Sequence, residues 1–354
     1  MINNIKISGY KSIKEMDLDL LPINILIGSN GVGKSNFISF FKLVNNLYEK
    51  NLERYSIEEG VDRLMYYGRK HTDTIHGYLN FGYNQYDFKL GANKGGSLYI
   101  KEETSLCSGH SDNYPQHNEQ ESYVKDSSYT RNRFLSEQFE SFKIYHFHDT
   151  EANSKLRSIC KIDDNQFLKV NGSNLPAFLY YLQEKAPKSL KRIEANIRSV
   201  MPYFEGFDLH PRKLNPEEIQ LEWKDETDLD EFFTAMDLSD GSLRFIALST
   251  LLMQPDLPNT ILIDEPELGL HPVAIAKLAG LIKSAAARNC QMIISTQSVD
   301  LINHFNPEDV ITVDRKDGQS VFSRLNGTEL EHWLEDYSLG ELWSKSVING
   351  QPGI

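Results

Sequence analysis

Eight consecutive residues near the start of the chain combine the residue types and the spacing that bind phosphate. Residues 28–35 read Gly-Ser-Asn-Gly-Val-Gly-Lys-Ser, which is the pattern of a P-loop. Glycines let successive backbone N–H groups surround the phosphates, because no Cβ stands in the way. Lys34 is expected to reach the outer phosphates, and Ser35 to place its hydroxyl on Mg²⁺. The other expected nucleotide contacts in this segment are Asn30, Gly31, Gly33 and Asn36.

Two adjacent carboxylates, Asp264 and Glu265, follow the apolar run 260–263. Such a run predicts a buried strand that carries the acids to its carboxyl end, where open α/β sheets bind their ligands. Asp264 is expected to hold Mg²⁺, and Glu265 to orient or deprotonate an attacking water. Acids at strand ends also serve as helix caps. It is the P-loop elsewhere in the chain that favours the catalytic interpretation.

A third group, Ser239, Asp240 and Gly241, precedes a run with apolar residues at helical spacing. The hydroxyl of Ser239 can cap that helix, and Gly241 allows a backbone to come close to a ligand. A capped helix N-terminus can bind an anion. The same triplet is also an ordinary start of a helix, and both interpretations stay open on these residues alone.

The elements around these residues alternate between strands and helices. The pattern predicts a half-exposed strand at 4–10, a fully buried strand at 23–27, and a helix directly after the glycine-rich loop. Strands at 260–263, 292–295 and 310–313 accompany a helix at 272–287. Strand, glycine-rich loop and helix in this order are the context that turns the phosphate-binding pattern into a predicted site.

The middle of the chain has a different pattern. Short alternating segments between 66 and 104, separated by glycines, predict hairpin strands. Residues 105–132 are rich in Ser, Asn, Gln, His and Asp, so we expect a long mobile loop there. A strand at 142–147, helices within 176–201 and a strand at 219–223 follow. We expect a core from 1–50 and 236–354, a β-rich insertion at 51–150 and a helical lid at 151–235.

Composition limits the partners of this protein. A formal net charge of −13 and a pI near 5.3 disfavour a surface that binds nucleic acid throughout. No apolar run is long enough to span a membrane, and the first residues lack the layout of a signal peptide. The three cysteines lie far apart in the sequence and form no Cys-x-x-Cys pair. We expect a cytoplasmic protein without a membrane partner. One local basic segment could still contact DNA; its residues are Lys185, Lys188, Lys191, Arg192 and Arg198.

Together these motifs resemble those of ABC/SMC-like ATPases, which build one nucleotide site across a long insertion. Lys34 and Asp264 are 230 positions apart, and the resemblance covers residues 1–50 and 236–315. Segment 238–245 is similar to the signature motif of that group. By this resemblance Ser239 and Gly241 contact the γ-phosphate bound by a second subunit. The resemblance therefore implies ATP and Mg²⁺ as cofactors and a homodimer with ATP between two heads.

Shorter segments are similar to further motifs of the group. Lys11 lies where SMC and RecF-like heads place a basic residue beside the nucleotide, although an exposed turn lysine fits equally well. Segment 267–272 resembles the D-loop of the head–head interface. Gln297 stands where many relatives have a switch histidine, and glutamine can donate to the γ-phosphate but cannot carry a proton. The strand end at His148 and Asp149 is a candidate for the Q-loop, which the sequence does not assign.

The resemblance implies an α/β P-loop NTPase fold of the ABC/SMC head type, with a mixed sheet and an inserted β-rich and helical subdomain. Within the group the chain is most similar to compact RecF-like and OLD-like ATPases of the AAA family, without a Toprim domain. It implies an ATP-hydrolysing head that acts as a sensor or scaffold for a separately encoded effector, such as a nuclease, in bacterial phage defence. The alternative is a RecF-like DNA-binding ATPase in repair or genome maintenance, and a transporter subunit is disfavoured by the insertion and the tail. In the tail, Trp333 and Trp343 either dock a partner or pack on the parent domain.

Overall fold

A computed structural model describes residues 1–107, 110–113, 121–125 and 132–350, which form two compact units. Unit 1 contains Met1–Ile144, Asn259–Leu262 and Asn289–Ile354, and unit 2 contains Tyr145–Pro258 and Ile263–Arg288. The P-loop therefore belongs to unit 1, whereas the predicted signature motif and carboxylate pair belong to unit 2. The two units are grouped differently from the expected core, β-rich insertion and lid, and that division into subdomains stays a prediction.

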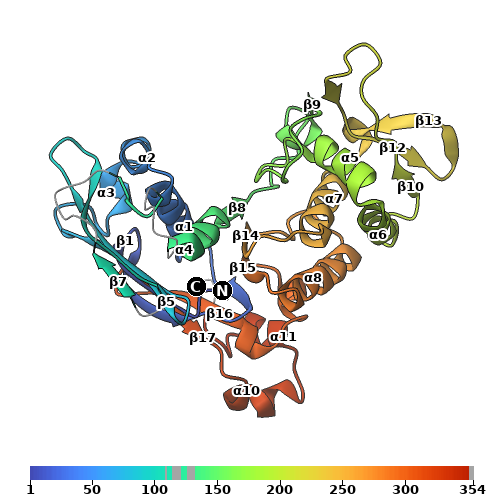
Figure 1. Ribbon diagram of the computed structural model, residues 1–354. Helices are drawn as coiled ribbons and strands as arrows, with labels where there is room; N and C mark the ends of the chain where they lie inside the picture. The colour runs from blue at the N-terminus through green and yellow to red at the C-terminus, as the bar shows by residue number, and fades with distance from the viewer. Residues whose placement is uncertain (108–109, 114–120, 126–131, 351–354) are drawn as a thin grey trace. The chain divides into compact units, whose positions relative to one another are not determined.

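The predicted mixed sheet is centred in unit 1 and has the strand order β17-β16-β3-β15-β14-β8 (Figure 1). β3 (Ile23–Ile27) pairs in parallel with both β15 (Gln291–Thr296) and β16 (Val310–Lys316). On the β16 side, the edge strand is β17 (Gln319–Arg324), which is antiparallel to β16. On the β15 side, β14 (Thr260–Asp264) comes next and β8 (Lys143–Tyr145) is the edge strand. All six residues of β15 are buried, as a parallel strand covered on both faces requires.

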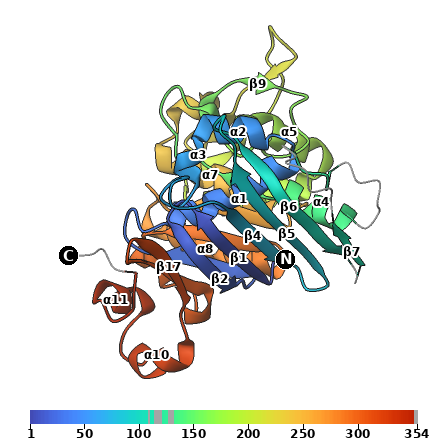
Figure 2. The same cartoon turned by 90° about the vertical axis from the view of Figure 1, so that its left-hand side faces the viewer.

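A second, antiparallel sheet in unit 1 has the order β2-β1-β4-β5-β6-β7, and Figure 2 shows these strands side by side. β1 (Asn4–Tyr10) joins the first hairpin to the predicted β-rich insertion, because it pairs with β2 on one edge and with β4 on the other. The insertion thus extends the sheet that the N-terminal residues begin. The remaining bounds are β2 (Ile13–Asp19), β4 (Ile75–Asn80), β5 (Asn84–Ala92), β6 (Leu98–Cys107) and β7 (His110–Asn113).

Helix α1 (Lys34–Tyr48) packs against both sheets of unit 1. The rings of Phe40 and of Phe88 in β5 are stacked, with their centroids 6.0 Å apart. The ring centroids of Phe37 and of Phe322 in β17 lie 5.5 Å apart. Burying one such side chain stabilises the fold by roughly 1.5–3 kcal/mol. Because α1 begins at the end of the P-loop, this packing fixes the loop within unit 1. Three shorter helices of this unit are α2 (Leu52–Glu59), α3 (Val61–Leu64) and α4 (Arg133–Glu140).

Part of the segment expected to be a long loop is regular. β6 continues to Cys107 and pairs with β7, and the carboxylate of Glu103 accepts hydrogen bonds from the hydroxyl of Ser122 and the backbone of Tyr123. Polar composition is a poor guide here, because a strand pair is held by backbone groups that every residue except proline supplies. Residues 108–109, 114–120 and 126–131 of this segment lie outside the described residues.

Unit 2 combines four helices with two small sheets. α7 (Asp240–Met253) packs against α6 (Pro187–Arg198) and α8 (Pro272–Ala287), and Asn196 donates to the hydroxyl of Ser249 at 3.0 Å. The strand predicted at 219–223 is in fact two strands in different sheets, since the chain changes partner after β11 (Glu218–Ile219). The other elements are α5 (Leu175–Lys185), β9 (Cys160–Lys161), β10 (Phe204–Phe207), β12 (Glu222–Asp225) and β13 (Asp228–Thr234).

The C-terminal tail packs on unit 1 through helix α11 (Leu339–Ser344), which contacts α9 (Val299–Ile302). The indole of Trp343 is buried and donates to the carbonyl of Gly350 at 3.0 Å. Trp333, in α10 (Gly327–Leu334), is 44% exposed. Packing on the parent domain is therefore what the structure shows for Trp343. Within the described part of the chain, no helix is long and apolar enough to cross a lipid bilayer.

Candidate nucleotide-binding site

The P-loop of unit 1 adopts a conformation that requires glycine at Gly33. Its φ angle is 121°, and a Cβ built there would lie 2.1 Å from the Ser320 Oγ and 2.9 Å from the Ser12 Oγ. Both hydroxyls are held in place: they share a 2.6 Å hydrogen bond, and Ser320 donates to the carbonyl of Val32. The loop is thus packed from behind, and its other side, with Asn30, Gly31 and Ser35, is exposed.

Lys34 is the first residue of α1 and is 5% exposed. Its ammonium group donates to the carbonyls of Gly28 at 2.5 Å and Ser29 at 3.1 Å. These carbonyls hold the cationic group within the loop, while the N-terminus of α1 contributes its own positive dipole end. An anion with several oxygens, such as a polyphosphate, fits this combination of a cation, backbone N–H groups and a helix N-terminus.

Asn36 and Lys11 lie in the supporting structure of the loop. The amide of Asn36 donates to the Ser12 Oγ at 2.7 Å and so ties α1 to the turn between β1 and β2. Lys11 occupies that turn with a φ of 48°. Burial lowers the pKa of Lys11, and the nearby carboxylate of Glu59 partly opposes this shift. The ammonium of Lys11 lies over the ring of Tyr10, 5.6 Å from the ring centroid, and its predicted contact with the nucleotide stays a prediction.

The structure brings Gln297 to the same sheet edge as the P-loop. β15 and β3 are parallel neighbours, and Thr296 at the end of β15 is paired with Ile27 at the end of β3. Gln297 and Gly28 are the next residues of the two strands. The expected switch residue and the P-loop therefore leave adjacent strands at their carboxyl ends, where open α/β sheets bind ligands.

In unit 2, Asp264 ends β14 and Glu265 follows it with a φ of 43°. A non-glycine residue in the left-handed region is strained, and such strain concentrates at functional sites. Both acids line a small pocket with His148 and Arg244. Burial lowers the pKa of Arg244 from its usual value, and the carboxylates of Asp240 and Glu267 only partly oppose this shift. His148, which the sequence offers as a candidate for the Q-loop, therefore lies near the residues predicted to hold Mg²⁺ and to activate water.

The predicted signature motif begins α7 as expected. Ser239 is exposed and caps the helix, because its hydroxyl accepts from the backbone of Ser242 at 3.2 Å. A Cβ at Gly241 would lie 2.4 Å from the backbone carbonyl of Gly269, within the predicted D-loop. The two segments therefore pack so closely that only glycine fits between them.

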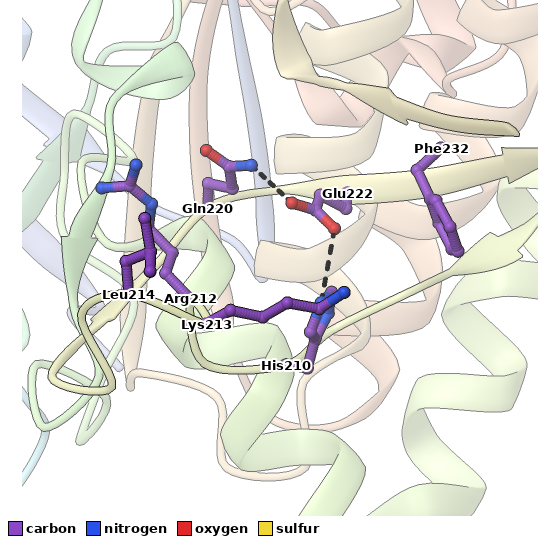
Figure 3. A pocket seen from close by; sticks show the side chains of 7 residues that line it. All are labelled: His210, Arg212, Lys213, Leu214, Gln220, Glu222 and Phe232. Carbon is purple, nitrogen blue, oxygen red and sulfur yellow. Dashed lines mark hydrogen bonds and ion pairs between the residues drawn. The ribbon is translucent and has the colours of Figure 1, made fainter.

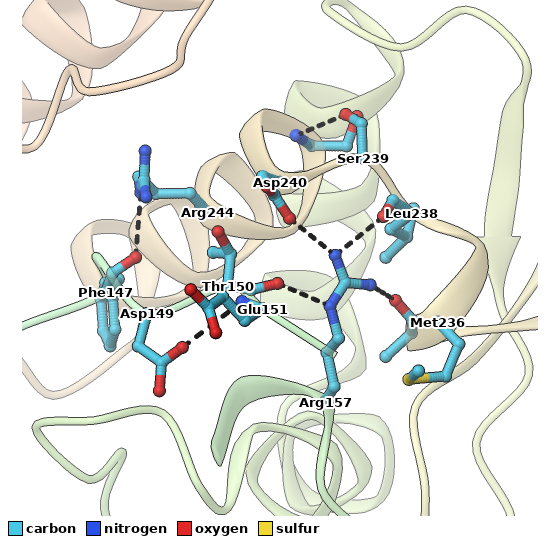
Figure 4. Close-up of polar contacts among 12 residues, drawn as sticks. Phe147, Asp149, Thr150, Glu151, Arg157, Met236, Leu238, Ser239, Asp240 and Arg244 are labelled. Atoms are coloured by element: carbon cyan, nitrogen blue, oxygen red, sulfur yellow. Dashed lines mark hydrogen bonds and ion pairs between the residues drawn. The ribbon is translucent and has the colours of Figure 1, made fainter. Parts of the chain in front are cut away.

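Two buried arginines fasten the chain after β8 to the start of α7 (Figure 4). The guanidinium of Arg157, whose side chain is 7% exposed, donates to the carbonyls of Thr150 at 2.8 Å, Leu238 at 3.0 Å and also Ala235. It also forms an ion pair with Asp240 at 2.9 Å. Arg244 donates to the carbonyl of Phe147 at 2.9 Å and to that of His148 at 2.8 Å. The predicted signature motif and the loop that carries His148 are therefore held as one piece of unit 2.

Sequence reasoning missed Arg157, Arg244 and Ser320. Arg157 is 83 positions from Asp240, and Ser320 is 288 positions from Val32. Contacts at such separations leave no local pattern. The sequence carried a signal only at Gly33. A glycine at this position of the loop indicates that other atoms come close to its backbone, but not which residues supply those atoms.

Comparison with protein families matches residues 111–303, more than half of the chain, to the family described as "AAA domain, putative AbiEii toxin, Type IV TA system". The match includes Ser239, Asp264, Glu265 and Gln297 and begins after the P-loop. Among curated proteins, no match to this chain is found.

Solved structures of SMC head domains have the same fold. One, an SMC head bound to the C-terminal winged-helix domain of ScpA, is 14% identical, with a TM-score of 0.61 over 94% of this chain and 99% of that one. Another, from Pyrococcus furiosus, carries an extended coiled coil and is bound to the C-terminal domain of ScpA. It is 14% identical, with a TM-score of 0.55 over 95% and 98% of the two chains. The predicted α/β head fold is confirmed: the chain belongs to this AAA family, and its architecture is that of an ABC/SMC-type P-loop head.

Proposed function

We propose that this chain binds ATP with Mg²⁺, hydrolyses ATP, and uses ATP to hold two copies of itself together. The P-loop carries this proposal: Lys34 is held inside it, Gly33 has a conformation that only glycine adopts readily, and a 15-residue helix begins at its end. Lys34, Asn30, Gly31, Gly33 and Asn36 would contact the phosphates or form their cradle, and Ser35 would be a metal ligand.

Asp264, Glu265 and Gln297 are the groups proposed to complete the reaction. Carboxylate and hydroxyl oxygens are the ligands that Mg²⁺ prefers, so Asp264 and Ser35 fit this ion. When bound, Mg²⁺ would neutralise charge on the phosphates. Glu265 would accept a proton from the attacking water, and Gln297 would donate a hydrogen bond to the γ-phosphate.

Dimerisation is supported by the start of α7. Ser239 is exposed at the N-terminus of a 14-residue helix, in a unit that does not contain the P-loop. Its hydroxyl and the first backbone N–H groups of α7 form a place where an anion is stabilised. We therefore propose that Ser239 and Gly241 contact the γ-phosphate bound by a second copy.

The test uses Glu265→Gln, with Lys34→Ala as a matched control. Glu265→Gln should retain ATP binding, lose turnover and accumulate an ATP-dependent dimer, as measured by equilibrium binding, phosphate release and light scattering. Lys34→Ala should lose ATP binding and the dimer together. Normal hydrolysis by Glu265→Gln would contradict the assigned base, and a monomer that binds ATP would contradict the dimer.

We further propose that the head is a cytoplasmic sensor or scaffold that controls a separately encoded effector, such as a nuclease, in phage defence. Two comparisons support a protein partner: the SMC heads were solved bound to a domain of ScpA, and the family description names a toxin of a type IV toxin–antitoxin system. Co-purification with the product of a neighbouring gene, present with wild type and ATP and lost with Lys34→Ala, is the expected result. A complex that forms equally with both proteins would exclude ATP control.

A RecF-like role on DNA is the second candidate. Lys185, Lys188, Lys191, Arg192 and Arg198 are all exposed on α5 and α6. If these residues bind DNA, affinity should fall steeply as salt rises, and charge reversal at Lys188 and Lys191 should weaken it. Absence of salt-dependent binding in the presence of ATP would exclude this role.

A further inference from the structure

The three-stranded sheet of unit 2 gathers three metal-ligating side chains outside the proposed nucleotide site. Asp208 follows β10 and donates its backbone N–H to the carbonyl of Glu222 in β12 at 2.9 Å. Phe207 and Trp223 are cross-strand partners, so Asp208 and Glu222 are the next opposite pair. His210 lies two positions further along.

The ligating atoms of these three residues converge. One atom of each of Asp208, His210 and Glu222 lies within 4.8 Å of the other two. Figure 3 shows the imidazole of His210 directed toward the carboxylate of Glu222, with 3.7 Å between the His210 Nε2 and the Glu222 Oε2. That distance is too long for a hydrogen bond and is suited to two ligands of one cation.

The orientation of the imidazole supports a cation in this position. The His210 Nδ1 lies 3.3 Å from the backbone carbonyl of Asp208. A carbonyl only accepts, so the Nδ1 must carry the proton and donate. In a neutral imidazole the Nε2 then presents its lone pair, and it presents it to a carboxylate oxygen. A backbone carbonyl on the Nδ1 is the arrangement that orients metal-binding histidines for coordination through the Nε2.

Three basic side chains, those of Lys224, Arg212 and Lys213, lie near these carboxylates. Two acids directly opposite on a sheet repel each other. The ammonium of Lys224 is 3.9 Å from Asp208 and also lies over the ring of Phe232, while Arg212 is paired with Glu218 at 2.8 Å. A divalent cation between Asp208 and Glu222 would replace their repulsion by attraction to a shared charge.

The site has room for further ligands. His210 and Glu222 line a cavity of about 370 Å³ together with Arg212, Lys213, Gln220 and Phe232. The amide of Gln220 donates to the other oxygen of Glu222 and so orients that carboxylate. Water molecules in this cavity could complete the coordination shell around three protein ligands.

We propose that Asp208, His210 and Glu222 bind a first-row divalent metal ion such as Zn²⁺. One imidazole nitrogen and two carboxylate oxygens form a borderline donor set, which Zn²⁺ satisfies and for which Ca²⁺ lacks preference. The ion would cross-link the segment after β10 to β12. The proposed metal site contains none of the residues proposed to bind ATP.

Titration of the full chain with ZnCl₂, in the absence of nucleotide, tests the site by calorimetry and by thermal unfolding. Wild type should bind one equivalent saturably and show a raised Tm. His210→Ala and Glu222→Gln should each weaken that binding by at least the roughly 10- to 100-fold that loss of an outer-shell partner costs. Without metal, Glu222→Gln should be at least as stable as wild type, because the cross-strand repulsion is removed.

Two variants serve as controls. His304→Ala removes an exposed imidazole elsewhere, and Asp264→Asn removes the carboxylate proposed for Mg²⁺. Both should bind Zn²⁺ as wild type does. Wild-type affinity in His210→Ala and Glu222→Gln, or no saturable binding by the wild type, would overturn the proposal. Loss of Zn²⁺ binding in Asp264→Asn alone would place the ion at the nucleotide site and overturn it as well.

Discussion

The guanidinium of Arg157 lies 2.9 Å from the carboxylate of Asp240, across 83 positions of sequence. The same guanidinium donates to the carbonyls of Ala235 and Leu238, so its donors hold the turn that leads into α7. Arg157 is therefore a positioning residue for the proposed signature motif, because it acts through the segment that presents Ser239.

Replacement of Arg157 should separate ATP binding from dimerisation. Arg157→Lys keeps a positive charge but loses the planar fork, so buried carbonyls lose their donors at a cost of roughly 1–3 kcal/mol of unfolding free energy. We expect ATP affinity at the P-loop to stay within about twofold, a difference of roughly 0.4 kcal/mol, while ATP-dependent dimerisation and kcat fall. Asp240→Asn, at a side chain 65% exposed, should have much smaller effects. Equal losses of ATP affinity and dimerisation in Arg157→Lys would argue for general misfolding instead.

Gly241 and Gly280 form a matched pair of helical glycines. Alanine normally stabilises a helix by about 1 kcal/mol relative to glycine. At Gly280 of α8, where no described atom beyond the adjacent helix backbone and chain neighbours lies within 4 Å of the added Cβ, this gain should be observed by urea unfolding. At Gly241 the Cβ would lie 2.4 Å from the carbonyl of Gly269, so Gly241→Ala should instead destabilise by roughly 1–3 kcal/mol. A gain at both positions would show that the two segments do not pack as described.

Alanine variants at Gly33 and Gly31 distinguish the effect of steric clashes from the effect of backbone conformation in the P-loop. At Gly33 an alanine meets Ser320 and Ser12 and adopts an unfavourable φ of 121°. Gly31 also has a positive φ, of 79°, but among the described residues no atom beyond its two chain neighbours lies within 4 Å of an added Cβ. Gly33→Ala should lose ATP binding and roughly 1–3 kcal/mol of stability, and Gly31→Ala should lose less of both. Fluorescent-nucleotide titration and chemical unfolding measure the two effects, and equal losses would contradict the packing at Ser320.

The strained backbone at Glu265 predicts that this residue lowers the stability of the fold although ATP hydrolysis requires it. Asparagine adopts the left-handed region more readily than glutamate, because its short side chain bonds locally. Glu265→Asn should therefore raise the unfolding free energy by up to about 1 kcal/mol while hydrolysis is lost. Glu265→Gln should also lose hydrolysis, with stability near that of the wild type. The strain would be refuted by an Asn variant less stable than the Gln variant in thermal unfolding.

The half-buried position of Lys11 predicts a pH-dependent contribution to the stability of the fold. Burial lowers the pKa of Lys11 below 10.5, so the unfolded chain binds this proton more strongly than the folded chain does. Stability therefore increases with pH between the folded-state pKa and 10.5, as the folded state is relieved of a buried charge. Lys11→Met should lack this increase and be at least as stable as wild type at pH 7, with weaker ATP binding. Lys14→Met, at an exposed neighbour, should keep the wild-type profile.

The elements next to the motifs were predictable because their signals are local. The strands β1 and β3, helix α8 and the cap at Ser239 follow from alternation, apolar runs and capping chemistry within a few residues. The same local rules missed β7, whose residues are polar, and merged β11 with β12, because the sheet that a strand joins is decided by partners distant in sequence.

By itself, the sequence determined that this chain has a phosphate-binding loop before a helix, an acidic pair after a buried strand, and the fold class that places such residues at a sheet edge. Only the tertiary structure decided that Ser320 and Ser12 pack behind Gly33, that Arg157 and Arg244 fasten one loop to α7, and that His210 meets Glu222. The physical reason is the range of the interactions. Backbone conformation and amphipathic patterning act over a few residues, whereas side-chain packing and buried hydrogen bonds join residues whose separation in the sequence carries no information.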